Sequence, residues 1–70
     1  MDVMEQTIDK LNGYTQREQF RFFMWWRSSC KGDDDYQRFH RITNSKNLDG
    51  FDWSIIYNML NVYEGEQECI

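Results

Sequence analysis

Three side chains, Cys30, His40 and Cys69, are of the types that act as nucleophiles, general bases or soft metal ligands. A structural zinc site needs four such ligands, commonly with close pairs such as Cys-x-x-Cys, and no such pair occurs. Cys30 and His40 also lack the local motif that accompanies a catalytic cysteine. No glycine-rich phosphate loop or serine elbow is present either. We therefore expect no enzyme activity, no catalytic residue, no metal and no cofactor.

Three consecutive aspartates, Asp33 to Asp35, offer oxygen ligands of the kind that calcium prefers. An EF-hand loop that began at Asp33 would need glycine at its sixth position and glutamate at its twelfth. Those positions hold Arg38 and Asn44, so the EF-hand pattern fails. Acidic residues also favour the positive end of a helix dipole. The run therefore predicts a loop that leads into the first turn of a helix.

Basic side chains interleaved with aromatic ones could contact phosphates and stack on bases. Two neighbouring segments carry such a set, which supports nucleic-acid binding as an alternative function: Arg17, Arg21, Lys31, Arg38 and Arg41. The aspartate run between the segments would repel a phosphate backbone, and the net charge of the chain is −4. Residues 47–70 carry five acidic and no basic side chains. These acidic residues are too few, and the segment is too short, to mimic the phosphates of a nucleic-acid duplex.

Helix start and stop signals place these residues on four segments. Asp2 precedes residues 3–12 as an N-cap, and Thr15 with Glu18 forms a capping-box signature before residues 16–29. The aspartate run precedes a short helix at residues 35–43. Asp52 is the expected cap of residues 53–63, where Ser54, Asn58 and Asn61 would form one polar stripe. Gly65 is expected to end that helix.

The sequence thus predicts an all-α fold of three to four short helices in a single domain over residues 1–64. Residues 65–70 are expected to form a frayed acidic tail. The N-terminal residues lack the apolar segment of a signal peptide, and no apolar run is long enough to span a bilayer. We expect a cytoplasmic protein without a membrane partner.

The central helix would be unusually rich in aromatic side chains. Phe20, Phe23 and Met24 follow the i, i+3, i+4 spacing of a single stripe, which we expect to face the core. Phe22, Trp25 and Trp26 lie outside that stripe, so the helix is apolar nearly all round. Such a helix is either buried on all sides or has a partner. A β-strand is the less favoured alternative for this segment, because the adjacent apolar pairs Phe22-Phe23 and Trp25-Trp26 break the alternation that a strand requires.

A chain of 70 residues buries too little surface to be very stable alone, and it carries more aromatic surface than four short helices need. We therefore predict a non-catalytic protein-interaction module that binds itself as a homodimer or a partner protein. Aromatic residues and arginine dominate interface hot spots. The predicted interface is Phe22, Trp25, Trp26, Arg21 and Arg27. Size and style, without a shared motif, match small regulatory or inhibitory proteins of phages and mobile elements.

Overall fold

The computed structural model describes residues 2–68, which form four helices and no strand. The helices are α1 (Val3–Asn12), α2 (Gln16–Ser29), α3 (Asp33–Asn44) and α4 (Gly50–Glu68). The predicted all-α fold is confirmed. No helix among the described residues is both long and apolar enough to cross a membrane.

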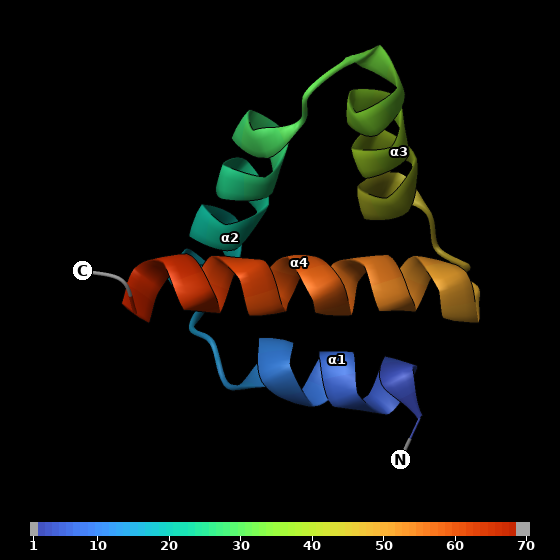
Figure 1. Cartoon of the computed structure of the whole chain (residues 1–70). Coiled ribbons are helices and arrows are strands. Elements are labelled where there is room, and N and C mark those ends of the chain that lie inside the picture. Colours follow the sequence, from blue (N-terminus) through green and yellow to red (C-terminus); the bar gives the residue numbers. More distant parts are fainter. Residues whose placement is uncertain (1, 69–70) are drawn as a thin grey trace.

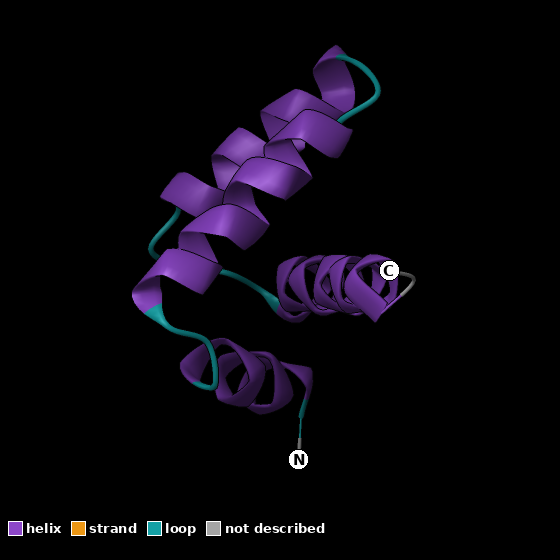
Figure 2. Ribbon diagram, turned by 90° about the vertical axis from the view of Figure 1, so that its left-hand side faces the viewer, coloured by secondary structure: helices purple, strands orange, loops and turns teal. Residues whose placement is uncertain are grey.

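Helix α4 lies across the middle of the molecule, between α1 on one side and α2 with α3 on the other (Figure 1). α1 packs along one side of α4, while α2 and α3 form a helical hairpin on the other side (Figures 1 and 2). The Cα atoms extend 31 × 30 × 19 Å, so the shortest dimension holds about two helix diameters. A domain this thin can bury only the side chains that point into the angles between helices.

The predicted bounds of α1 and α2 are those of the structure, because both helices begin at the expected caps. The Glu5 backbone N–H donates to Asp2 Oδ1 at 2.9 Å. The Glu18 backbone N–H donates to Thr15 Oγ1 at 3.1 Å, and the Thr15 backbone N–H donates to Glu18 Oε1 at 2.9 Å. This reciprocal pair is a complete capping box and fixes where α2 starts.

Helices α3 and α4 are longer than predicted. The aspartate run forms the first turn of α3 instead of a preceding loop. At α4 the predicted cap was wrong: Asp49 caps the helix, since its Oδ1 accepts from the Asp52 backbone N–H at 2.8 Å. The helix therefore begins at Gly50, directly after this cap. Asp52 lies inside the first turn of α4, and its carboxylate is free for another partner.

The C-terminal end of α4 also lies beyond the predicted stop. The helix continues through Gly65 to Glu68, so the predicted tail is partly helical, and residues 69–70 lie outside the described residues. Two carboxylates of this end are held from opposite sides. Glu64 pairs with Lys10 of α1, and Glu66 accepts a hydrogen bond from the Trp25 indole N–H of α2. These tertiary contacts offset the unfavourable position of acidic residues at a helix C-terminus.

The apolar core lies where α2, α3 and α4 meet. Its buried members are Phe22, Trp26, Phe39, Ile42, Ile56 and Leu60. The α1–α4 contact is more polar. There Thr7 is fully buried, its hydroxyl donating to the Val3 carbonyl oxygen at 2.7 Å with the Trp53 carbonyl oxygen 3.5 Å away. In the polar stripe predicted for α4, Asn58 and Asn61 are exposed and Ser54 is half-buried.

Candidate interaction surface

The face that α2 turns to the core differs from the one predicted. Phe22 is fully buried and Trp26 is 5% exposed, whereas Phe20 is 66% and Met24 38% exposed. Of the stripe expected to face the core, Phe20 and Met24 therefore face outward, while Phe23 is half-buried and packs against the core. Phe22 and Trp26, which were predicted for the interface, are core residues of this chain.

Ring contacts explain why this face of α2 turned inward. Trp26 meets Phe39 of α3 edge-on with ring centroids 5.0 Å apart, and Phe22 meets Tyr63 of α4 at 5.5 Å. Trp26 and Phe22, one helical turn apart on α2, thus pack against α3 and α4 respectively. Trp25 is half-buried beside Tyr63, with its indole N–H bonded to Glu66. Trp25 therefore serves mainly to tie α2 to the end of α4.

The outward side of α2 combines two apolar side chains with three arginines. Arg17, Phe20, Met24 and Arg27 recur at i, i+3, i+7 and i+10, and Arg21 follows Phe20 on the same side. All five residues are exposed. We call this set the α2 stripe. The arginines are the signal that could have found it, because they fall within about 80° of the Phe20–Met24 direction and away from Phe22 and Trp26.

The guanidinium groups of the α2 stripe form no close ion pair. The two ion pairs among residues 2–67 involve other residues, and the nearest acidic influence on the stripe is Glu18, whose pKa is lowered by its hydrogen bonds with Thr15 and further by the Arg21 charge. Arg27 donates to the hydroxyl of Tyr36 at 3.4 Å, with its guanidinium carbon 5.7 Å from that ring centroid. This contact holds one arginine against α3 without neutralising its charge. The α2 stripe therefore consists of two apolar side chains flanked by three positively charged ones.

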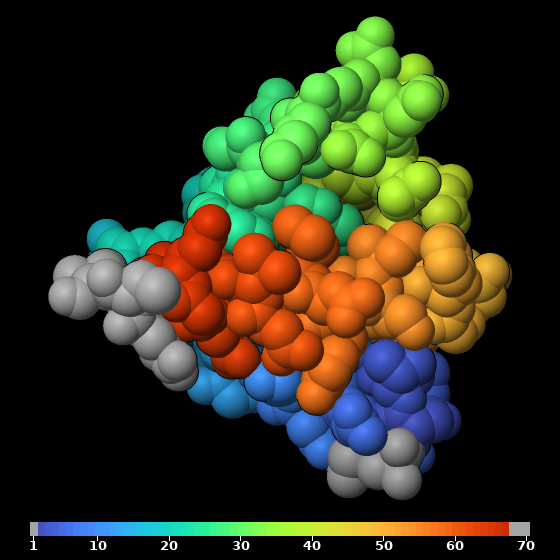
Figure 3. Space-filling view, viewed as in Figure 1, coloured from blue at the N-terminus to red at the C-terminus, as the bar shows by residue number. Residues whose placement is uncertain are grey.

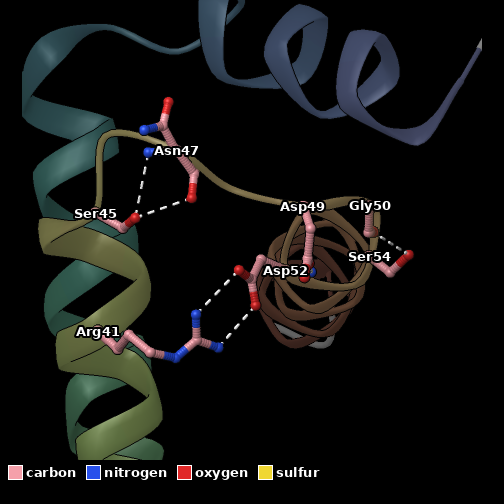
Figure 4. Close-up of polar contacts among 7 residues, drawn as sticks. All are labelled: Arg41, Ser45, Asn47, Asp49, Gly50, Asp52 and Ser54. Carbon is pink, nitrogen blue, oxygen red and sulfur yellow. Dashed lines mark hydrogen bonds and ion pairs between the residues drawn. The ribbon is translucent and has the colours of Figure 1, made fainter.

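The five basic residues expected to bind nucleic acid do not share one surface. Arg17 and Arg21 belong to the α2 stripe, whereas Lys31 and Arg38 line a pocket between the hairpin and α4. Arg41 is occupied: its Nη1 and Nη2 atoms donate to the two carboxylate oxygens of Asp52 at 3.0 and 2.7 Å (Figure 4). The predicted phosphate-contacting surface is thus divided among three places.

The Arg41–Asp52 pair joins α3 to the first turn of α4. Asp52 is almost fully buried, while Arg41 reaches it from a largely exposed position. Hydrogen bonds from Arg41 lower the pKa of Asp52 below its usual value, against the opposing effect of burial. Both carboxylate oxygens of Asp52 are bonded to one guanidinium and its side chain is only 5% exposed, so the group is held within the fold. We interpret this pair as structural.

Two pockets flank the hairpin. The first, of about 200 Å³, lies between α2, α3 and α4, with Trp26 and Met59 in its lining; we call it the hairpin pocket. The second, of about 530 Å³, lies at the corner where α1 passes into α2, against the end of α4. In that corner the Tyr14 hydroxyl donates to Glu64 Oε2 at 2.9 Å and the Lys10 ammonium lies 2.7 Å from Glu64 Oε1. Burial, followed by this hydrogen bond, raises the pKa of Tyr14 strongly.

The residues with possible nucleophilic or metal-binding chemistry lie in ordinary surroundings. The Cys30 thiol is half-buried and donates to the Trp26 carbonyl oxygen at 3.5 Å, and burial, followed by the nearby Asp35 charge, raises its pKa. His40 is exposed and meets the Tyr36 ring at 5.0 Å. Cys69 lies outside the described residues. Within residues 2–68, no three His, Cys, Asp or Glu side chains form a group that could hold a metal ion.

No protein-family model matches this chain, and no curated protein and no solved structure is significantly similar to it.

Proposed function

We propose that the protein is a non-catalytic binding module that regulates a partner protein by occupying a groove on it with the α2 stripe. The observation that carries this proposal is the exposure of Phe20 and Met24 on one helix face, flanked by three arginines that form no close ion pair among residues 2–67. In this proposal Phe20 and Met24 replace Phe22 and Trp26 as the apolar anchors of the interface. Arg21 and Arg27, which the sequence analysis included in the interface, remain part of it.

The α2 stripe has the pattern of a helix that binds in an apolar groove. In that mode, anchors at i, i+4 and i+7 enter the groove while charged side chains remain at its rim. Phe20 and Met24 supply adjacent anchors, and burial of their remaining exposed surface would contribute a part of the about 1.5–3 kcal/mol that full burial of such a side chain gives. Because the opposite face of α2 is fixed in the core by Phe22 and Trp26, the stripe is held in a helical conformation before binding. Such pre-organisation lowers the entropic cost of association.

Charge favours a different protein over a second copy of this chain. A symmetric dimer through α2 would place the three arginines of one copy against those of the other, and like charges across an interface are unfavourable. A groove with carboxylates at its rim would match both the anchors and the arginines. We therefore expect a monomer by sedimentation velocity, and an acidic partner. A dimer that Met24→Asp converts to monomer would instead assign the stripe to self-association.

Nucleic-acid binding is the second candidate, and the exposed pair Arg17 and Arg21 favours it. The other three basic residues of that prediction lie elsewhere or are engaged with Asp52, so few phosphates could be contacted together. Titration of a fluorescent duplex at increasing salt tests this candidate. Tight binding that weakens steeply with salt and is lost in Arg17→Gln would favour it over a protein partner.

Site-specific photo-crosslinking tests the protein-binding proposal. A photoreactive phenylalanine analogue would replace Met24 in the α2 stripe or, as the matched control, Asn58 on the outward side of α4. Both positions are exposed and helical, so each variant should fold. We expect a distinct protein adduct from position 24 that is absent from position 58 and survives nuclease treatment. No adduct from position 24, or the same adducts from both positions, would contradict the proposal.

A further inference from the structure

We infer that the hairpin pocket is a binding site for a small carboxylate that carries a compact apolar body. The pocket opens between α2, α3 and α4 and is separate from the α2 stripe, which lies on the opposite side of α2 from Trp26. Its apolar lining comes from Trp26, Ile55 and Met59. These side chains belong to two helices that are fixed by the core, so the lining is formed before any ligand binds.

The size of the hairpin pocket limits what can enter it. At about 200 Å³ it is smaller than the roughly 300–1,000 Å³ of pockets that hold drug-sized ligands. A nucleotide or a flavin does not fit such a volume. A single ring or a short aliphatic chain does, and the Trp26 ring and the Met59 thioether are suitable contacts for it.

Charged groups around the pocket select an anion. Lys31 and Arg38 line it, and neither takes part in an ion pair among residues 2–68. The third charged group, Asp35, uses its Oδ2 to accept the Lys31 backbone N–H at 3.3 Å. The lining therefore holds two cations and one carboxylate, and burial, followed by the Asp35 charge, raises the pKa of the Cys30 thiol. A ligand carboxylate placed beside Lys31 and Arg38 would meet two sets of donors that no carboxylate among residues 2–67 occupies.

The thiol in the lining does not compete with an anionic ligand. Cys30 donates to the Trp26 carbonyl oxygen, and its raised pKa keeps the sulfur neutral. A neutral thiol behaves as a small apolar group, so it extends the lining formed by Trp26 and Met59. An ionised thiolate at the same place would repel the ligand.

Titration of the isotope-labelled full chain with phenylacetate, followed by two-dimensional amide NMR, tests this inference. Phenylacetamide and phenethylamine serve as neutral and cationic analogues of similar size. For about ten non-hydrogen atoms we expect a dissociation constant of about 1 mM. The shifts should be largest at the Trp26 indole N–H and at the amides of Ile55 and Met59. Phenylacetamide should bind about threefold to fivefold more weakly, as the loss of one exposed charge contact implies, and phenethylamine more weakly still.

Arg38→Gln is the decisive variant, because Arg38 is exposed and its loss should leave the fold intact. It should weaken phenylacetate to nearly the level of phenylacetamide and leave phenylacetamide unchanged. Arg17→Gln, the same substitution on the α2 stripe, should change neither. The inference is overturned if phenylacetate causes no shifts at the pocket, if the shifts centre on other residues, or if the three analogues bind equally. It is also overturned if Arg38→Gln and Arg17→Gln have the same effect.

Discussion

The carboxylate of Asp52 accepts two hydrogen bonds from the guanidinium of Arg41, at 3.0 and 2.7 Å, and joins α3 to α4 (Figure 4). This pair and the Lys10–Glu64 pair attach two different helices to α4, which occupies the centre of the face seen in Figure 3. In a domain about two helices thick, such contacts supplement a small apolar core. Each has a consequence for stability that depends on pH.

Asp52→Asn should destabilise the protein at neutral pH and have little effect in acid. Arg41 lowers the pKa of folded Asp52 below its ordinary value of 3.8, so the folded state binds this proton less readily than the unfolded state. The stabilisation is therefore fully present above about pH 5 and is lost as the pH falls through the lowered folded pKa. Urea unfolding of wild type and variant across this range would measure it. Asp9→Asn, which removes an exposed carboxylate of α1, is the control and should cause no comparable loss.

Tyr14→Phe should abolish a loss of stability that we expect in alkaline solution. Burial and the hydrogen bond to Glu64 raise the pKa of folded Tyr14 above the ordinary value of 10.0. A raised pKa means that the folded state holds its proton longer, so this stabilisation is complete below about pH 10 and declines as the pH rises further. Unfolding followed by circular dichroism at increasing pH would show the decline in wild type only. An identical decline in Tyr14→Phe would mean that other groups cause it.

Phe22→Ala should reduce stability far more than Phe20→Ala, although the two residues are only two positions apart in sequence. Removal of the fully buried Phe22 ring should cost about 3–5 kcal/mol, a large part of the total stability of a small domain. Removal of the exposed Phe20 ring should change stability by about 0.5 kcal/mol or less. Thermal or urea unfolding would measure both. Equal losses would mean that α2 presents a different face to the core.

The orientation of α2 could have been predicted from its charges, which the apolar spacing concealed. Phe20 with Met24 and Phe22 with Trp26 both satisfy an i, i+4 spacing, so periodicity alone allows two opposite faces. Arginines flank the first pair, and an arginine in the core of so thin a domain would have to lose its water without a partner. The positions of the arginines therefore favour Phe22 and Trp26 as the buried pair. The contact of Trp25 with Glu66, 41 residues away, could not be predicted from local pattern.

The helix ends show the same division between local and distant causes. The capping box at Thr15 and Glu18 depends only on neighbouring residues, so sequence placed the start of α2 correctly. The end of α4 depends on Lys10, Tyr14 and Trp25, which lie far away in the chain. Gly65 was therefore a misleading stop signal. The start of α4 was misplaced because two aspartates three residues apart could each serve as the cap, and Arg41 engages the second.

Thr15→Ala should destabilise the protein by about 1 kcal/mol, the usual cost of removing a helix N-cap. The Thr15 hydroxyl accepts from the Glu18 backbone N–H, and that donor would be left without its partner. Thr15→Ser keeps the hydroxyl and should be close to wild type. Comparison of the two variants by urea unfolding separates loss of the cap from loss of the methyl group. Equal destabilisation by both would show that the cap contributes nothing.

The most direct test of the proposed function compares Phe20→Ala with Phe51→Ala in binding to the protein that is crosslinked through position 24. Phe20 is 66% and Phe51 68% exposed, so the two variants remove the same side chain from similarly exposed sites on different helices. Titration calorimetry should show a loss of about 2 kcal/mol or more for Phe20→Ala, as for an interface hot spot, and no change for Phe51→Ala. Equal affinities of Phe20→Ala and wild type, or equal losses in both variants, would contradict binding through the α2 stripe.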